Sequence, residues 1–406
     1  MTTEQVQPRG LTRRDLLRAS AALGLTALPG ARAPASSGAS PAAGPIMKPL
    51  PPELFTVFGT NAETKWEALR GQGYHTPIDR FFVRNHTATP TIDAETWRLK
   101  LFGSGLHGNP TVAQPIEFSY ADLCALPSQE ISAFIECAGN GRSFYTSQQG
   151  QTVSGSAWKL GAVGVARWRG VRLSTVLRRA GLTPTAVDVM PSGLDAHFIS
   201  NGVDLGAVRR PLPIAKALKD VLLAYEMNGE VLPPDHGFPV RLVVPSWIGI
   251  ASIKWVGSLE VSDQTLTSPW NTEFYRLFGP DYPAEGSLPL TRQVVKSAFE
   301  LPWPATLQVD RRHLLTGRSW SGNGAVRRVE VTVDGGTTWR PARPIGRTSR
   351  TGWLRWEIPW RPTATGNYQL LARATDDTGV SQPEIAPYNT LGYLFGAVVR
   401  HPVVIA

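Results

Sequence analysis

The feature that most constrains the fold is a regular alternation of apolar and polar residues in the last third of the chain. Apolar side chains occupy every second position in residues 329–333, 354–360 and 368–374. Such a period of two is typical of strands with one buried face. Asp334, Gly335 and Gly336 follow the first of these segments and predict a turn. Three alternating segments in about 50 residues therefore predict an all-β, immunoglobulin-like sandwich domain, to which we assign residues 285–406.

Residues 53–284 have a different sequence pattern, which predicts a mixture of strands, loops and short helices. Apolar residues from Leu173 to Ala180 follow helical spacing, and Gly181 provides a C-terminal cap. Residues 240–244 form a short apolar strand that Pro245 ends. The predicted fold class is therefore α+β, with this mixed domain preceding the all-β domain.

The first 33 residues predict an export signal. Arg13 and Arg14 precede a weakly apolar run over residues 19–28, and residues 31–33 form an A-x-A cleavage site. The adjacent arginines favour the twin-arginine route to the periplasm, which carries folded proteins. The alternative is an ordinary secretory signal with a chance arginine pair. Residues 34–52, rich in Ala, Ser, Gly and Pro, are expected to be a flexible leader.

Composition and motifs exclude several classes of protein. The chain has 41 Lys+Arg against 32 Asp+Glu, and its basic residues are dispersed, which argues against nucleic-acid binding. No apolar run reaches the roughly 18 residues of a membrane span. The seven histidines and two cysteines form no zinc-hydrolase motif, and no C-x-x-C-H motif for covalent haem is present, so no haem is expected in this chain.

The candidate chemistry lies around Cys137. A strand-like run over residues 134–136 leads into a glycine-rich turn that ends at Arg142. Such a turn lets the backbone approach a bound group closely. The nearby guanidinium favours the thiolate, which is either a nucleophile or a soft metal ligand. The alternative is a structural disulfide with Cys124. Both interpretations remain open on the spacing alone.

Several blocks, in the correct order over residues 53–406, resemble the sulfite oxidase family of molybdenum enzymes. The blocks are Phe81–His86, Glu136–Arg142, Gly193–Asp195, Leu223–Glu230, His236–Arg241, Ser252–Trp255, Ser319–Gly322, Val333–Gly336 and Arg373–Asp376. The resemblance implies a molybdopterin domain followed by an immunoglobulin-like dimerisation domain. It also implies a homodimer, or a heterotetramer with an electron-accepting subunit.

The resemblance also implies site residues. Cys137 becomes the thiolate ligand of molybdenum, and Arg84 and Arg142 become the groups that hold an anionic substrate. The positions implied to bind the cofactor, molybdenum-molybdopterin, are Phe82, Val83, Arg84, Asn85, His86, Cys137, Asp195, His236, Arg241, Ser252, Ile253 and Lys254. Arg241 and Lys254 can neutralise its phosphate, and Asp195 can accept from its amino group. Trp158 either lines the pocket or is a core aromatic residue.

Two departures from the family's sulfite-oxidising members concern substrate. Val208 stands at the apparent place of a tyrosine, and Leu391 stands at the place of an arginine. The C-terminal segment is similar to that of the molybdenum subunit of sulfane dehydrogenase. The resemblance then implies a periplasmic oxidoreductase that acts on sulfane sulfur held by a carrier protein and reduces a c-type cytochrome. Alternatives are a sulfite dehydrogenase, a methionine-sulfoxide reductase of the same fold, and a cofactor-free binding protein.

The second cysteine is predicted to be a free thiol if Cys137 binds the metal. Cys124 has apolar neighbours at positions 121, 123, 125 and 126. Free cysteine is among the residue types most often buried. We therefore expect Cys124 to be buried and unpaired.

Overall fold

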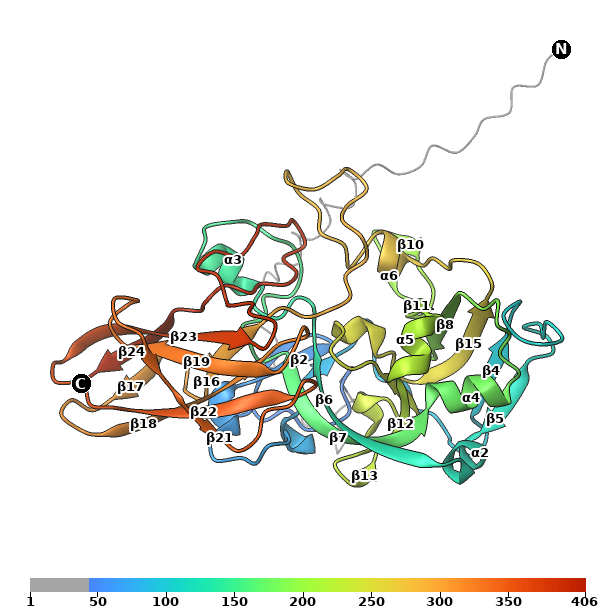
Figure 1. Ribbon diagram of the computed structural model, residues 1–406, viewed down its shortest axis with the longest axis horizontal. Helices are drawn as coiled ribbons and strands as arrows, with labels where there is room; N and C mark the ends of the chain where they lie inside the picture. Colours follow the sequence, from blue (N-terminus) through green and yellow to red (C-terminus); the bar gives the residue numbers. More distant parts are fainter. Residues whose placement is uncertain (1–43) are drawn as a thin grey trace, which may run out of the picture.

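The computed structural model describes residues 44–406, which form two units side by side (Figure 1). The predicted export signal, residues 1–33, lies outside the described residues. The first unit ends with α6 (Pro269–Thr272), and the second begins with β16 (Lys296–Phe299). The predicted boundary at residues 284 and 285 falls in the loop between these elements.

The first unit contains two five-stranded sheets with short helices. One sheet has the strand order β11 (Leu212–Pro213), β8 (Asp188–Gly193), β15 (Val256–Ser262), β4 (Arg98–Phe102) and β5 (Ile116–Ser119). The other has the order β13 (Glu230–Val231), β12 (Leu222–Met227), β7 (Val163–Arg172) and β6 (Ser128–Glu136), with β14 (Arg241–Val243) also paired to β12. The pairing of β6 with β7 is long, and it delivers the end of β6 to the middle of the molecule.

Smaller elements complete the first unit. A three-stranded sheet is formed by β1 (Phe55–Phe58), β2 (Asn61–Thr64) and β3 (Val83–Arg84), and β9 (Ile199–Ser200) pairs with β10 (Val203–Asp204). The other α-helices are α2 (Tyr120–Ala125), α3 (Ser143–Ser147), α4 (Leu173–Arg179) and α5 (Ile214–Lys219). The mixed α+β character predicted for this part of the chain is confirmed.

The predicted helix beginning at Leu173 is α4. Its apolar stripe, including Val176 and Leu177, is buried in the largest core of the first unit. Gly181 follows the end of α4 with φ of +82°, and its backbone N–H bonds to the carbonyl oxygen of Arg178. Glycine adopts this left-handed conformation without steric cost, so the predicted C-terminal cap is confirmed.

The second unit is a sandwich of two sheets. One has the order β16, β18 (His313–Trp320), β22 (Trp353–Trp360) and β21 (Arg343–Ile345). The other has the order β17 (Ala305–Leu307), β24 (His401–Ile405), β23 (Gly366–Asp376), β19 (Val326–Thr332) and β20 (Arg340–Pro341). The alternating residues of both sheets meet in one core, including Trp356, Ile358, Val331 and Ala372. The predicted β-sandwich is confirmed.

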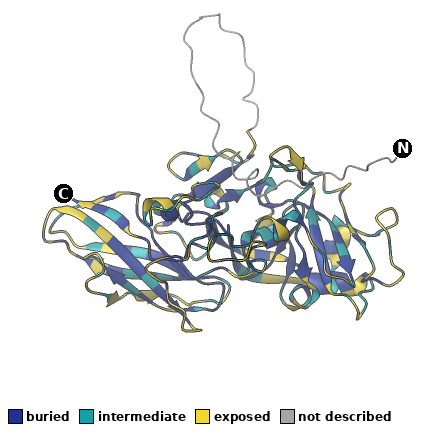
Figure 2. Ribbon diagram, turned by 90° about the horizontal axis from the view of Figure 1, so that it is seen from above, coloured by how far each residue is buried: buried dark blue, intermediate teal, exposed yellow. Residues whose placement is uncertain are grey.

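Burial extends across the junction of the two units. In Figure 2 the buried positions follow the sheet interiors and continue through the loops between the units. A core that includes Phe134 and Tyr145 from the first unit also contains Trp320, Trp353 and Phe395 from the second. The two units therefore share apolar side chains, which favours a fixed relative orientation.

The described part of the expected flexible leader, residues 44–52, is held in place. Ile46 is buried, and the backbone N–H groups of Met47 and Lys48 donate to the Asp235 carboxylate at 2.7–3.1 Å. The Lys48 ammonium donates to the carbonyl oxygens of Ile78 and Phe81. The expectation of flexibility is wrong for these residues, because composition says nothing of a distant carboxylate that can anchor a backbone.

Both cysteines are free, so the disulfide alternative is excluded. Cys137 is buried, but Cys124 is exposed, and the prediction that it is buried is wrong. The reason is local. Ser119 and Asp122 cap the short surface helix α2, which buries only Leu123, so the next residue faces solvent.

Within residues 44–406, no helix has the length and apolar character needed to cross a membrane.

Candidate active site

The predicted site residues converge on one cavity of about 710 Å³, which we call the deep cavity. Eleven of the thirteen predicted residues line it: Phe82, Arg84, Asn85, His86, Cys137, Asp195, His236, Arg241, Ser252, Ile253 and Lys254. The other two are Val83 and Arg142. The Val83 side chain packs into a small core with Phe55 and Ala62, away from the cavity. Arg142 lines a second cavity described below.

The deep cavity is built where strands of the first unit end. Arg84 ends β3, and the following loop carries Asn85 and His86. Two short 3-10 helices, η3 (Pro234–His236) and η4 (Gly249–Ala251), bring in His236 and the segment 252–254. Trp255 has φ of +51°, a conformation that non-glycine residues seldom adopt and that is often found at functional sites.

Cys137 directly follows β6 and lies where the deep cavity meets the second cavity, because it lines both. Its backbone N–H donates to the carbonyl oxygen of Ala162 at 3.0 Å. Two residues further, a Cβ atom at Gly139 would lie 2.5 Å from Nη2 of Arg142. Glycine at this position therefore lets the guanidinium of Arg142 fold back over the turn that carries the thiol.

The second cavity, which we call the outer cavity, is wide and open to solvent. It comprises about 2020 Å³. Arg84, His86, Cys137 and Tyr275 line both cavities, so the two spaces communicate through these side chains. The remaining walls are mixed. Aromatic and apolar side chains include Trp158, Phe198, Phe274, Phe278, Leu391 and Tyr393, and polar or charged ones include Arg142, Ser156, Asn201, Glu273, Glu285 and Thr390.

Cations of the deep cavity lack carboxylate partners. Within the described residues, Arg84, Arg241 and Lys254 form no ion pair with Asp or Glu within 4.0 Å. Arg241 is 4% exposed and donates only to carbonyl oxygens of residues 236, 242 and 252. Burial lowers the pKa of Arg241 to about 9 and lowers that of Lys254 well below its usual value. Three basic residues therefore line the cavity against two carboxyl groups, Asp195 and Asp235, and an anionic ligand would stabilise the charged form of the buried cations.

The two histidines of the deep cavity are neutral. Burial, together with nearby cations, lowers the pKa of both His86 and His236 well below the usual value. Nε2 of His86 accepts from Trp270 Nε1 at 3.1 Å and lies 3.0 Å from Arg84 Nη2, so its proton is on Nδ1. Nε2 of His236 is buried without a hydrogen-bond partner within the described structure. A ligand that donates or accepts a hydrogen bond would satisfy it.

Asp195 lies on the wall formed by the loop after β8. Its carboxylate accepts from the backbone N–H of Val208 at 3.4 Å, and burial raises its pKa to about 6. Val208 itself lines the deep cavity. A buried carboxyl with spare accepting capacity is suited to the amino and ring N–H groups of a heterocycle.

Several functional residues were missed by the sequence reasoning. Tyr275 lines both cavities, and its hydroxyl lies where the charges of Arg84 and Cys137 act on it. Val208 stands at the apparent place of the family's tyrosine, and Tyr275 supplies a tyrosine to both cavities from the loop after α6. Asp235 and Lys48 were also missed. No local pattern distinguishes them, because their contacts join segments nearly 190 residues apart.

The residues of this site supply one candidate soft metal ligand rather than a metal cage. Within residues 44–406, no group of three or more His, Cys, Asp or Glu side chains could hold a metal ion. A metal beside Cys137 would therefore take most of its ligands from outside the protein, for example from a bound organic group. This requirement, and the cationic deep cavity beside the thiol, agree with the pterin cofactor implied by the sequence resemblance.

Comparisons with known proteins agree with this geometry. The family model described as oxidoreductase molybdopterin binding domain matches residues 86–270, and that described as Mo-co oxidoreductase dimerisation domain matches residues 293–405. Human mitochondrial sulfite oxidase is 37% identical over 356 residues, covering 83% of this chain and 63% of that protein. Chicken sulfite oxidase is 36% identical over 358 residues, covering 82% of this chain and 74% of that protein.

A solved structure extends the comparison. The sulfane dehydrogenase SoxCD from Paracoccus pantotrophus matches with a TM-score of 0.71 and 29% identity, over 83% of this chain and 82% of that chain. The chain spans less than two thirds of the length of the human and rat sulfite oxidases, 63% and 62%. The matched domains and the identity to relatives show that the chain belongs to the sulfite oxidase family of molybdopterin oxidoreductases.

Proposed function

We propose that the protein oxidises a sulfur compound by oxygen-atom transfer, with molybdenum-molybdopterin in the deep cavity and Cys137 as the thiolate ligand of the metal. The preferred substrate in this proposal is sulfane sulfur held by a carrier protein. The cofactor, when bound, supplies the transferable oxygen and takes up the two electrons. The protein supplies position, charge and exclusion of water.

The deep cavity fits such a cofactor. Arg241 and Lys254 donate to main-chain carbonyl oxygens, form no ion pair within 4.0 Å in the described structure, and would neutralise its phosphate. The unpartnered Nε2 of His236 and the carboxyl of Asp195 would bond to polar groups of the pterin. Arg84, Asn85, His86, Ser252 and Ile253 complete the cradle, and Phe82 supplies an apolar wall.

The outer cavity would receive the substrate. Arg84 and Arg142 line this cavity together with Cys137 and would hold an anionic sulfur group. Burial raises the pKa of the Tyr275 hydroxyl, so it stays protonated near neutral pH and can donate to that group. Trp158, which is 1% exposed, forms part of the wall as well as part of the core.

The observation that carries the choice of substrate is the size and lining of the outer cavity. About 2020 Å³ of space adjoins Cys137, and its lining combines aromatic side chains and Leu391 with uncharged polar residues and the carboxylates of Glu273 and Glu285. A small free dianion needs charged donors and is repelled by carboxylates, whereas a persulfide on a carrier brings its own recognition surface and can occupy a wide cavity of mixed polarity. The structural similarity to a sulfane dehydrogenase supports the same choice.

Sulfite itself is the second candidate. Arg84, Arg142 and Tyr275 together retain donors for a small oxyanion beside Cys137, and sulfite oxidases are the relatives with the greater identity. A methionine-sulfoxide reductase is less well supported, since such proteins resemble only the first unit, and a dimerisation domain matches residues 293–405 of this chain. The presence of Cys137 together with the residues that match the pterin-contact positions argues against a cofactor-free binding protein.

The proposal extends to partners and location. The Arg13-Arg14 signal supports export to the periplasm by the twin-arginine route. The chain has no C-x-x-C-H motif for covalent haem, so electrons would pass to an external c-type cytochrome. The dimerisation domain supports a homodimer, or a heterotetramer if the cytochrome is bound permanently.

Steady-state reduction of cytochrome c by the purified enzyme tests the substrate choice. One series contains sulfite, and the other contains a carrier protein loaded with thiosulfate-derived sulfane sulfur. The proposal predicts the larger specificity constant for the loaded carrier, with the unloaded carrier as control. Fast turnover of sulfite at micromolar KM, with no response to the carrier, would make the protein a sulfite dehydrogenase.

A further inference from the structure

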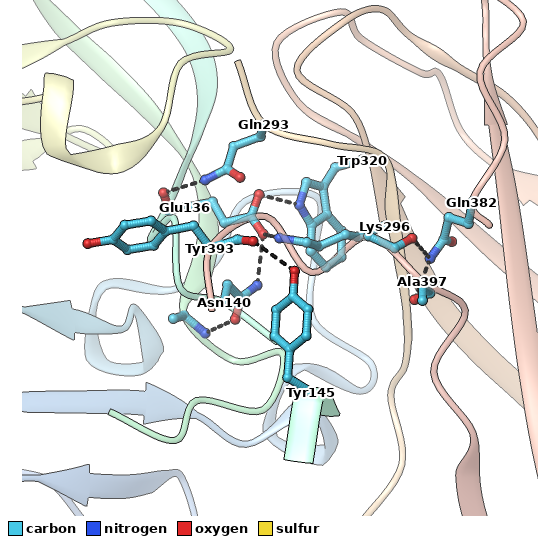
Figure 3. Close-up of polar contacts among 11 residues, drawn as sticks. Glu136, Asn140, Tyr145, Gln293, Lys296, Trp320, Gln382, Tyr393 and Ala397 are labelled. Atoms are coloured by element: carbon cyan, nitrogen blue, oxygen red, sulfur yellow. Dashed lines mark hydrogen bonds and ion pairs between the residues drawn. The ribbon is translucent and has the colours of Figure 1, made fainter. Parts of the chain in front are cut away.

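The residue before Cys137 is a fully buried carboxylate. Glu136 ends β6 and is 0% exposed. Its Oε1 atom accepts from Lys296 Nζ at 2.6 Å and from Asn140 Nδ2 at 2.9 Å, and its Oε2 atom accepts from Trp320 Nε1 at 2.8 Å (Figure 3). Both carboxylate oxygens are therefore satisfied, as a buried charge requires.

Most of these partners come from the second unit. Lys296 lies on β16 and Trp320 at the end of β18, and these two residues face each other in the β16–β18 ladder. Gln293, just before β16, donates from Nε2 to the main-chain carbonyl oxygen of Glu136 at 2.8 Å. The second unit thus forms hydrogen bonds with both the side chain and the backbone of Glu136, the residue that precedes Cys137.

The hydrogen bonds of Glu136 continue into the turn that carries the Cys137 thiol. Asn140 binds the Glu136 carboxylate through Nδ2, while its Oδ1 accepts from the backbone N–H of Ala162 at 2.9 Å. The carbonyl oxygen of that same Ala162 accepts from the Cys137 N–H. Movement of the Glu136 side chain would therefore be passed to both ends of the turn over residues 137–140.

The other side of the turn is also held by the C-terminal part of the chain. The backbone N–H of Leu394 donates to the carbonyl oxygen of Ala138 at 2.8 Å. The hydroxyl of Tyr145 donates to the carbonyl oxygen of Tyr393 at 3.0 Å. The second unit is therefore connected to the Cys137 turn by several hydrogen bonds, and the Glu136–Lys296 ion pair is the charged contact among them.

We propose that Glu136 and Lys296 are positioning residues, through which the second unit fixes the orientation of the Cys137 thiolate toward the cofactor. Stability alone does not require the Glu136–Lys296 ion pair, because well-packed apolar residues can replace a buried ion pair without loss. The proposal rests on the assignment of Cys137 as the metal ligand under Proposed function.

The test uses Lys296→Met and Glu136→Gln in the cofactor-loaded enzyme. The main readout is the thiolate-to-molybdenum charge-transfer absorption of the oxidised enzyme, because its energy and intensity depend on the orientation of the thiolate. We expect this band to shift in both variants. We also expect kcat to fall by about a hundredfold, the cost of misplacing reacting groups by about 1 Å, while KM stays within about twofold.

A matched control comes from the second unit itself. Arg318 and Glu300 form an ion pair of the same length, 2.6 Å, with side chains 0% and 4% exposed. Arg318 donates to Glu300, Leu69, Gln72 and Tyr74 but to no residue of the Cys137 turn. Glu300→Gln should lower the melting temperature yet leave the absorption band and kcat unchanged.

Two further variants keep the test decisive. The double variant Glu136→Gln/Lys296→Gln replaces the ion pair by an amide–amide hydrogen bond and should recover much of the band position. If the single variants fail to fold, Gln293→Met removes the hydrogen bond to the Glu136 carbonyl oxygen without leaving a charge unpaired. This variant should shift the band in the same direction.

The outcomes separate the two proposals. If wild type contains molybdenum but shows no thiolate band, the assignment of Cys137 is wrong. If wild type shows the band, and Lys296→Met, Glu136→Gln and Gln293→Met all retain it with wild-type kcat, the positioning role is wrong and the site assignment stands. An equal shift in the Glu300→Gln control would also overturn the positioning role.

Discussion

The Nε atom of Arg142 donates a hydrogen bond to the main-chain carbonyl oxygen of Leu391 at 2.9 Å. Nη1 of the same guanidinium donates to the carbonyl oxygen of Ser156 at 3.1 Å, and its centre lies 5.4 Å from the ring of Tyr393. Position 391 therefore orients Arg142 through its backbone, while its side chain lines the outer cavity. A substitution of Leu391 can change the charge of the entrance without removing the support of Arg142.

Leu391→Arg should raise the turnover of free sulfite. An added charged donor to an anion contributes about 1.5–3 kcal/mol, which corresponds to about one to two decades in kcat/KM. The measurement is steady-state sulfite oxidation, with Leu391→Met as a control of similar volume and no charge. Equal kcat/KM values for the Arg variant and wild type would contradict the role assigned to this position.

Cys137→Ser should leave a folded protein that retains the pterin but has lost almost all turnover. A serine hydroxyl is a harder ligand than a thiol and is far less readily deprotonated. Circular dichroism and pterin fluorescence of the released cofactor check fold and retention, and cytochrome c reduction checks turnover. Activity near that of wild type would show that the thiolate is not a ligand that the reaction needs.

Tyr275→Phe should lower kcat/KM about five- to tenfold, since one hydrogen bond contributes about 1–1.5 kcal/mol. Burial raises the pKa of the Tyr275 hydroxyl, so it is not ionised near neutral pH. The shape of the pH–rate profile between about pH 6 and pH 8 should therefore be the same in the variant. Tyr388→Phe is the control, because its hydroxyl donates to the Thr152 carbonyl oxygen and Tyr388 lines neither cavity.

The buried carboxyl group of Glu63 should make the free energy of unfolding depend on pH. Glu63 is 4% exposed, and burial raises its pKa from 4.5 to about 7. Between these values the folded state binds more protons than the unfolded state, so the contribution of Glu63 to stability falls as pH rises. Its pKa shift makes Glu63 destabilising by about 3 kcal/mol above pH 7.

Glu63→Gln should therefore raise the free energy of unfolding by about 2–3 kcal/mol more at pH 8 than at pH 5. Urea denaturation at the two pH values measures the difference. The exposed Glu53→Gln serves as control and should show no comparable gain. A gain for Glu63→Gln that is equal at both pH values would mean that the carboxyl titrates normally.

The local sequence pattern was sufficient to predict secondary structure where the sequence neighbours of a residue determine its environment. The alternation of Leu354, Trp356 and Ile358 predicts a strand with one buried face, and these residues are buried in β22. The helical spacing ending at Gly181 predicts α4 for the same reason. Cys124 shows the limit. Its apolar neighbours do not reveal that the short helix α2 lies on the surface and exposes its last turn.

The site was predictable only where the family resemblance named its residues, and the structure brings eleven of those thirteen to one cavity. The rest depends on contacts between distant segments. Tyr275 reaches the Cys137 region from a loop after α6, and Asp235 binds the backbone of Met47. Lys296 pairs with Glu136 across 160 positions. No local pattern encodes such pairs, because they arise from the packing of the two units.

The central claim is that Cys137 binds the molybdenum of a bound pterin cofactor. X-ray absorption at the molybdenum edge of purified, natively exported protein tests it most directly, with the metal content of each sample measured in parallel. The account predicts molybdenum in near-stoichiometric amount in wild type, and the loss of one sulfur ligand from its coordination shell in Cys137→Ser. An unchanged sulfur shell in that variant, or wild-type protein without molybdenum, would contradict the account.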